Sequence, residues 1–193
     1  AEDLDDAAMF GWDVPHKRFD WTVLRDNVLS EVSRIEGAYT DTLTNHDVQI
    51  FKERATLTGP NSVQLASGKT ISAEKILIAT GARPLMPEIP GIEHAISSNE
   101  TFHLEQLPKR IIIAGGGYIA NEFAGIFHQF GSKVTLVNRT DVLLRGYDQQ
   151  VVDRLIQISI RKGIDFKFHA TIDPLVRRDD GSLQVSMSGC DDI

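Results

Sequence analysis

The stretch that decides the fold runs from Arg110 to Arg145 and reads RIIIAGGGYIANEFAGIFHQFGSKVTLVNRTDVLLR. An apolar run, Ile111–Ala114, leads into three consecutive glycines, Gly115–Gly117, and then into a helical pattern of apolar residues. A second apolar run, Val134–Val137, follows the helical pattern. This order of strand, tight turn, helix and strand is the layout that holds the pyrophosphate of a dinucleotide at the start of the helix.

The glycine turn has the residue types that a phosphate site requires. Gly115 permits a tight turn, and Gly117 carries no side chain, so a pyrophosphate can approach the backbone. The third position of the fingerprint is Ala120, an accepted variant of glycine. Free N–H groups at the helix start, together with the helix dipole, favour an anion there. A tight turn with a purely structural role is the alternative interpretation.

The end of the second strand indicates which dinucleotide is bound. Asn138 occupies the position where an NAD site favours Asp or Glu, and Arg139 and Arg145 follow it. Two guanidinium groups without a carboxylate suit a ribose that carries a 2′-phosphate, so we predict an NADPH site. The alternative is that both arginines are solvated surface residues.

Composition limits the remaining possibilities. The 193 residues are enough for one medium domain or parts of two, and 41% hydrophobic residues allow a packed core. A net charge of −7 argues against a nucleic-acid partner, and no apolar run approaches the roughly 20 residues that span a bilayer. The single cysteine, Cys190, excludes an internal disulfide and a cysteine-based zinc site, and we expect no metal site. We expect a cytoplasmic protein and a fragment of a longer chain.

The rest of the chain divides into a helix, a meander and a linker. Residues 20–44 are predicted to form one helix, because apolar residues recur every three or four positions and Asp20 can cap it. A β-meander is expected over 48–80, and the proline-rich segment 84–91 is predicted to be a linker. Strands are predicted at 48–51, 55–58, 62–65, 75–79, 164–169 and 183–187, with further helices starting at 98 and spanning 147–162.

Several segments resemble one enzyme family. IAGGGYIANEFAGIF followed by VTLVNRTDVLLRGYD closely resembles the NADPH-binding segment of glutathione reductases, which belong to the flavoprotein disulfide reductases. SRIEGAY is similar to the helix after the redox-active disulfide, and ILIATGARP to the end of the first FAD-domain segment. The resemblance implies an α/β fold: a truncated, Rossmann-like three-layer NADPH-binding domain at 107–193, and part of an FAD-binding domain with a β-meander at 1–106.

The resemblance also assigns residue roles. Tyr118 is similar to a tyrosine that covers the nicotinamide pocket, and Glu122 to an acid that pairs with a lysine beside the flavin, so both are candidate catalytic residues. Tyr39 matches a residue that lines the substrate site, although core packing is an equal alternative. The candidate cofactor-binding residues are Ala55 for FAD and Gly115, Gly116, Gly117, Ile119, Ala120, Glu122, Arg139 and Arg145 for NADPH.

The function implied by the resemblance is NADPH-dependent reduction of glutathione disulfide through FAD and a redox-active disulfide, in a homodimer with no nucleic-acid or membrane partner. The cysteine pair of that chemistry is not in this sequence, so the isolated chain is expected to be inactive. The alternatives are another NADPH-linked flavoprotein that reduces a different disulfide or mercuric ion, and a non-catalytic nucleotide-binding module. Dihydrolipoamide dehydrogenases are disfavoured, because their NAD preference requires an acid at position 138.

Overall fold

The computed structural model describes residues 2–15 and 18–189. These residues form two compact units, a larger one of Ala1–Asp26 with Leu85–Ile193 and a smaller one of Asn27–Pro84.

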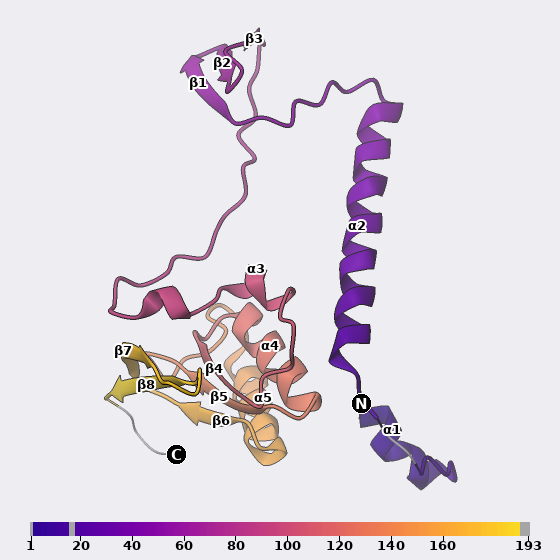
Figure 1. Cartoon of the computed structure of the whole chain (residues 1–193), viewed down its shortest axis with the longest axis vertical. Helices are drawn as coiled ribbons and strands as arrows, with labels where there is room; N and C mark the ends of the chain where they lie inside the picture. Colours follow the sequence, from indigo (N-terminus) through magenta and orange to yellow (C-terminus); the bar gives the residue numbers. More distant parts are fainter. Residues whose placement is uncertain (1, 16–17, 190–193) are drawn as a thin grey trace. The chain divides into compact units, whose positions relative to one another are not determined.

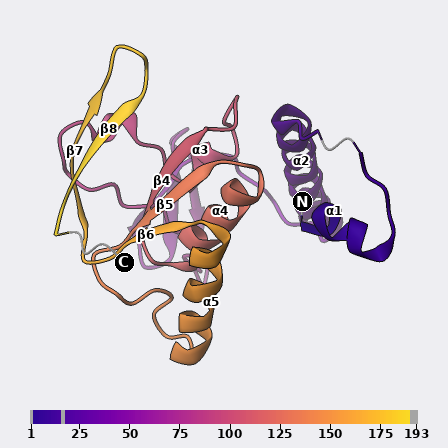
Figure 2. The same cartoon turned by 90° about the horizontal axis from the view of Figure 1, so that it is seen from below.

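A three-stranded parallel sheet in the order β4-β5-β6 is the centre of the larger unit (Figure 1). The strands are β4 (Arg110–Ala114), β5 (Lys133–Val137) and β6 (Asp165–Lys167). Helix α4 (Tyr118–Gln129) joins β4 to β5, and α5 (Gln149–Lys162) joins β5 to β6. Both crossovers move across the sheet in the same direction, from β4 to β5 and from β5 to β6. Right-handed connections therefore place both helices on one face of the sheet, as Figure 2 shows.

The core lies between this sheet and its two helices. The central strand β5 is paired on both edges, and its Val134 and Leu136 are completely buried. Helix α4 contributes Phe127 and α5 contributes Val152, each only 1% exposed. The buried cluster consists of Ala124, Phe127, Val134, Leu136, Leu143, Val152, Ile164, Phe166 and Phe168. This packing fixes the ends of β4 and β5, from which the glycine turn and the loop after β5 begin.

Side-chain caps mark the start of two helices of the larger unit. Oδ1 of Asp148 accepts hydrogen bonds from the N–H groups of Gln150 and Val151, at 3.0 and 3.2 Å. Helix α5 therefore begins at Gln149, two residues later than predicted. The short helix α3 (Ser98–Thr101) begins with a capping box, in which Ser97 hydrogen-bonds Glu100 and lowers the pKa of that carboxyl.

The start of the chain packs on the larger unit through aromatic side chains. The rings of Phe19 and Phe130 stack with centroids 4.2 Å apart, and Nε1 of Trp21 donates to the carbonyl of Leu104 at 2.7 Å. The elements before these residues are α1 (Glu2–Asp6) and the 3-10 helix η1 (Ala7–Phe10).

An antiparallel hairpin of β7 (Thr171–Arg177) and β8 (Leu183–Ser188) completes the larger unit. Strand β8 was predicted, whereas β7 was not. Pro174 interrupts the β7 sequence, and it lies where the pairing register shifts between Ile172 and Leu175. A proline is tolerated at such a bulge, because its missing N–H is not needed there. The N–H of Leu175 donates to the carbonyl of Pro90, which ties the linker and the 3-10 helix η2 (Ile92–His94) to β7.

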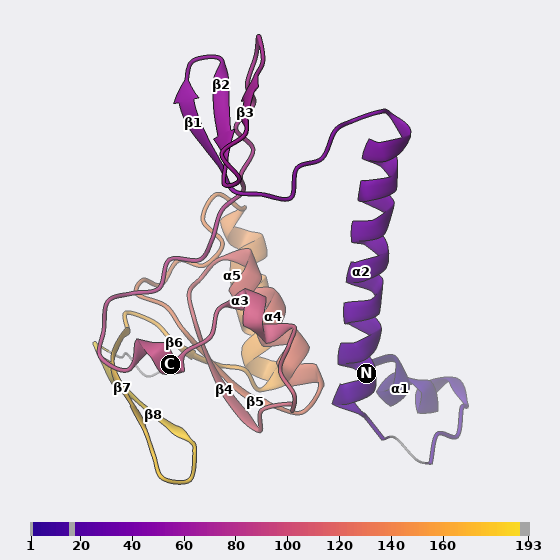
Figure 3. The same ribbon diagram turned by 45° about the horizontal axis from the view of Figure 1, so that its top comes forward.

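The smaller unit contains most of helix α2 (Trp21–Asn45) and a β-meander. Oδ1 of Asp20 accepts from the N–H of Thr22 at 3.0 Å, so the predicted helix and its cap are confirmed. The meander pairs its three strands antiparallel in sequence order, as Figure 3 shows. Its strands are β1 (Ala55–Gly59), β2 (Ser62–Leu65) and β3 (Thr70–Ser72).

Two predicted strands of the meander are wrong. Residues 48–51 and 75–79 have no regular structure, and Leu77 is 88% exposed. A strand requires a partner, and among the described residues neither segment is paired with another strand. The apolar sequence of 75–79 indicates a strand covered on both faces, but the described part of the chain leaves Leu77 and Ile78 exposed.

The α/β class, the parallel sheet and the β-meander are confirmed, whereas the predicted domain boundary after residue 106 stays a prediction. Within the described ranges, no helix combines the length and apolar character needed to cross a membrane.

Candidate functional site

The glycine turn lies between the carboxyl end of β4 and the start of α4. Gly115 adopts a φ of +126°, a conformation that residues with a Cβ rarely adopt. Its N–H donates to the carbonyl of Val137 at 2.9 Å, which joins the turn to the end of β5. The predicted tight turn is therefore present and lies beside the segment that carries Asn138.

The second and third glycines differ in what surrounds them. A Cβ on Gly116 would lie 2.9 Å from Cδ2 of Leu143 and 3.0 Å from Cγ of Asn138, so internal packing requires glycine at this position. A Cβ on Gly117 would meet nothing within 4 Å, and Gly117 has ordinary dihedrals of φ −80° and ψ 175°. The described protein atoms therefore do not explain a glycine at 117, whereas the close approach of a ligand would.

The start of helix α4 suits an anion. Gly117 is its N-cap, no side chain caps the helix there, and its first turn contains no acidic residue. Asn121 does not cap the N–H groups, since its Nδ2 donates to the carbonyl of Gly117 at 2.9 Å. The helix dipole and the uncapped N–H groups together favour a phosphate at this end.

The loop after β5 carries the two candidate arginines and lies against the turn. The N–H of Leu144 donates to the carbonyl of Gly116 at 2.7 Å, and Leu144 has an uncommon φ of +48°. Arg139 and Arg145 are exposed, and neither side chain is engaged by another residue of the described chain. The fold thus brings two unengaged guanidinium groups to the loop that borders the glycine turn.

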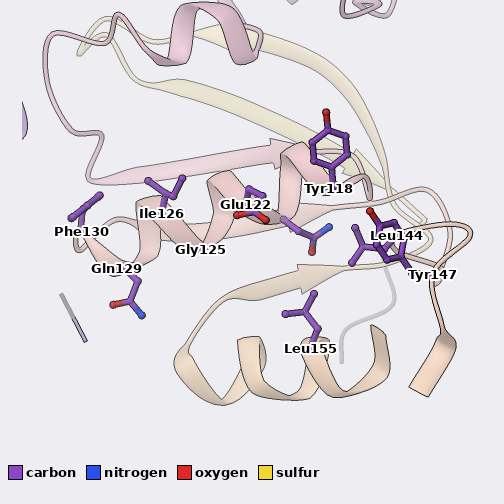
Figure 4. Close-up of a pocket in the computed structure, with 10 residues that line it drawn as sticks. Tyr118, Glu122, Gly125, Ile126, Gln129, Phe130, Leu144, Tyr147 and Leu155 are labelled. Atoms are coloured by element: carbon purple, nitrogen blue, oxygen red, sulfur yellow. The ribbon is translucent and has the colours of Figure 1, made fainter. Parts of the chain in front are cut away.

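Tyr118 and Glu122 line a pocket of about 460 Å³ along the outer face of α4 (Figure 4). Tyr118 is 63% exposed at the start of the helix, and Glu122 follows one turn later. Leu155 of α5 and Tyr147 contribute further apolar surface. The two candidate catalytic residues therefore share one surface that begins at the glycine turn.

The other two candidate residues belong to the smaller unit. Tyr39 is 70% exposed on α2, and Ala55 is exposed at the start of β1, paired with Leu65. Their roles toward a disulfide substrate and FAD stay predictions.

Three residues of this region carry roles that sequence reasoning missed. Leu144 hydrogen-bonds the glycine turn through its N–H, and Tyr147 lines the pocket. Asn138 is not only uncharged, since its side chain donates a hydrogen bond to the backbone of the loop. The cluster NRTD after an apolar strand was the available signal for Asn138, because Asn and Thr side chains in loops commonly bond nearby backbone groups.

The sequence matches the family described as Pyridine nucleotide-disulphide oxidoreductase over residues 5–191. The chain belongs to this family. The predicted resemblance is confirmed, and so, at the level of the family, are the expected cofactors NADPH and FAD.

Individual relatives agree with this assignment. The chain is 41% identical to a glutathione reductase of Burkholderia cepacia and 37% identical to one of Nostoc, over 96% and 97% of its own length. A trypanothione reductase of Trypanosoma congolense is 35% identical over 96% of the chain. The chain spans about two fifths of the length of these relatives, 41%, 40% and 40% respectively.

Solved structures show the same fold. The HOCl-induced flavoprotein disulfide reductase RclA from Escherichia coli superposes with a TM-score of 0.81 at 26% sequence identity. The match covers 96% of this chain and 41% of that protein.

The different surroundings of Gly116 and Gly117 allow a test of whether a ligand phosphate lies against Gly117. We expect Gly117→Ala to weaken NADPH binding by about tenfold or more, because the new methyl group takes the space that a pyrophosphate needs. The loss of unfolding free energy should be only about 1 kcal/mol or less, as expected at an open N-cap position. Calorimetric titration with NADPH and urea unfolding followed by tryptophan fluorescence measure the two quantities.

The matched control is Gly116→Ala, whose methyl group meets Leu143 and Asn138. This variant should lose roughly 1–3 kcal/mol of stability through overpacking. Unchanged NADPH affinity in a folded Gly117→Ala protein would contradict a phosphate site at the turn.

Proposed function

We propose that this chain is the NADPH-binding part, with a portion of the FAD-binding part, of a disulfide reductase that acts on glutathione disulfide. The observation that carries the proposal is the open glycine turn at Gly117, bordered by a loop with two unengaged arginines. The 41% identity to a glutathione reductase supports the substrate.

The pyrophosphate of NADPH would be held by backbone groups alone. The uncapped N–H groups of Tyr118 and Ile119, with Ala120 in the same turn of α4, would donate to it beside Gly117, where an added Cβ would meet nothing within 4 Å. Ala120 lies close beneath the turn, since a Cβ on Gly115 would contact its methyl group at 4.0 Å. A backbone cradle of this kind binds the phosphates of NADPH and NADH equally, so it gives affinity without preference.

The preference for NADPH would come from the loop after β5. Arg139 and Arg145 would each donate charge-assisted hydrogen bonds to the 2′-phosphate, worth roughly 1.5–3 kcal/mol apiece. At position 138 a neutral amide replaces the acid of NAD sites, so no carboxylate at this position repels the phosphate.

The nicotinamide would lie by Tyr118 and Glu122. When bound, the nicotinamide and the flavin supply the hydride chemistry that leads electrons to a disulfide. The exposed ring of Tyr118 would cover the nicotinamide and exclude water, and Glu122 would hold a lysine beside the flavin. Ala55 would contact FAD through its backbone, and Tyr39 would contact the disulfide substrate.

The setting of the whole protein is also part of the proposal. We expect a cytoplasmic homodimer that has no nucleic-acid or membrane partner. A second candidate substrate is a different disulfide, which the 35% identity to a trypanothione reductase favours. Comparing turnover of the two disulfides by the longer protein would distinguish these candidates.

The proposed role of Arg139 and Arg145 can be tested by removing both side chains. Replacing both residues, Arg139→Ala with Arg145→Ala, should lower NADPH affinity on the order of a hundredfold and leave NADH affinity nearly unchanged. The reason is that only NADPH carries the 2′-phosphate. Calorimetric titration of both nucleotides measures the effect.

A matched control for this pair is Arg177→Ala with Arg178→Ala, which removes two arginines at the β7–β8 hairpin. This control should leave both affinities unchanged. Equal losses of NADPH and NADH affinity in the Arg139/Arg145 variant would show that the two arginines do not read the 2′-phosphate.

The isolated 193-residue chain should not reduce glutathione disulfide. Its single cysteine cannot form the dithiol that passes electrons to the substrate. The measurement is NADPH oxidation at 340 nm with added FAD and glutathione disulfide, beside a complete glutathione reductase as positive control. Sustained turnover by the purified chain would refute this division of the chemistry.

A further inference from the structure

The amide side chain of Asn138 makes three contacts with the loop that carries the candidate arginines. Its Nδ2 lies 2.8 Å from the carbonyl oxygen of Thr140, 3.2 Å from Thr140 Oγ1 and 3.1 Å from the carbonyl oxygen of Val142. Two of these partners are carbonyl oxygens, which can only accept hydrogen bonds. The atom that faces them must therefore be the amide nitrogen, and Asn138 acts as a donor.

Asn138 is itself held from three sides. Its N–H donates to the carbonyl of Lys167 at 2.9 Å, and its own carbonyl accepts from the N–H of Ala170 at 3.1 Å. Its side chain packs against Gly116, where an added Cβ would lie 3.0 Å from Cγ and Nδ2 of the amide. The donor therefore projects from a fixed backbone position, between the glycine turn and the loop.

The loop is fastened at both ends, next to the two arginines. At its start, Asn138 precedes Arg139 and bonds the backbone of residues 140 and 142. At its end, Leu144 precedes Arg145 and donates to the carbonyl of Gly116 at 2.7 Å. Each guanidinium thus belongs to a residue that directly follows a fixed one.

We propose that Asn138 is a positioning residue for nucleotide specificity, which holds the 139–145 loop so that Arg139 and Arg145 meet the 2′-phosphate. This inference rests on the proposed function. An aspartate at the same position has the same shape but no donor, and its carboxylate would face the carbonyl oxygens of Thr140 and Val142. The amide therefore does more than remove a negative charge. It donates hydrogen bonds that hold the loop, whereas a carboxylate would repel the same carbonyl oxygens.

The first test measures the loop without any ligand. In Asn138→Ala and Asn138→Asp, the hydrogen-bonded amides of Val142 and Leu144 should exchange with deuterium about tenfold faster than in the wild type, the effect of losing about one hydrogen bond. The matched control is Asn61→Ala, since Asn61 also donates to two carbonyls, those of Ala73 and Glu74, but in the smaller unit. Unchanged exchange in both Asn138 variants overturns the inference.

The second test measures nucleotide binding by calorimetry. We expect Asn138→Ala to weaken binding of 2′,5′-ADP about tenfold and to leave 5′-AMP unaffected, because only the former carries a 2′-phosphate. In the background of Arg139→Ala with Arg145→Ala, adding Asn138→Ala should change 2′,5′-ADP binding no further, since Asn138 acts through the arginines.

The outcomes separate the inference from the function on which it rests. A wild-type chain that does not bind 2′,5′-ADP defeats the proposed function and, with it, the specificity role of Asn138. Two other outcomes overturn the inference and leave the proposed function standing. In the first, the wild type binds 2′,5′-ADP, but Asn138→Ala lowers the affinity for 2′,5′-ADP and for 5′-AMP equally. In the second, Asn138→Ala lowers the affinity for 2′,5′-ADP further in the background that lacks both arginines.

Discussion

The close approach of the glycine turn to the end of β5 is the contact on which the proposed site depends. Gly116 lies so near Leu143 and Asn138 that a single added carbon would be 2.9–3.0 Å from both. This approach allows the N–H of Gly115 to donate to the carbonyl of Val137 and the N–H of Leu144 to donate to the carbonyl of Gly116, which joins the turn and the loop into one surface. Gly117, the next residue, then faces open space at the start of α4.

We infer that one part of this surface provides affinity for a dinucleotide and another provides the preference for NADPH over NADH. The backbone N–H groups of α4 suit any pyrophosphate, whereas the loop after β5 can distinguish a 2′-phosphate from a hydroxyl. The chain carries a net charge of −7, so the attraction of an anion must be local. Arg139 and Arg145 meet this need, because no carboxylate of the described chain neutralises either of them.

The elements that sequence reasoning predicted are those whose signals are local. Gly115 to Gly117, the cap at Asp20 and the helical stripe of α2 depend on neighbours a few residues away. The strands predicted at 48–51 and 75–79 were wrong because a strand depends on a partner that is distant in the sequence. Strand β7 was missed because Pro174 is unusual within a strand and is accommodated here at a bulge. The donor role of Asn138 depends on the fold of residues 140–142, so its sequence position revealed the missing charge but not the hydrogen bonds.

We infer that the turn and the loop form one binding surface for NADPH. The most direct test is titration of the ¹⁵N-labelled chain with NADPH, followed by two-dimensional NMR of the backbone amides. We expect saturable shifts that are largest at residues 116–120 and 139–145, with the second group unmoved by NADH. Shifts confined to other parts of the chain, or none at millimolar NADPH, would contradict it.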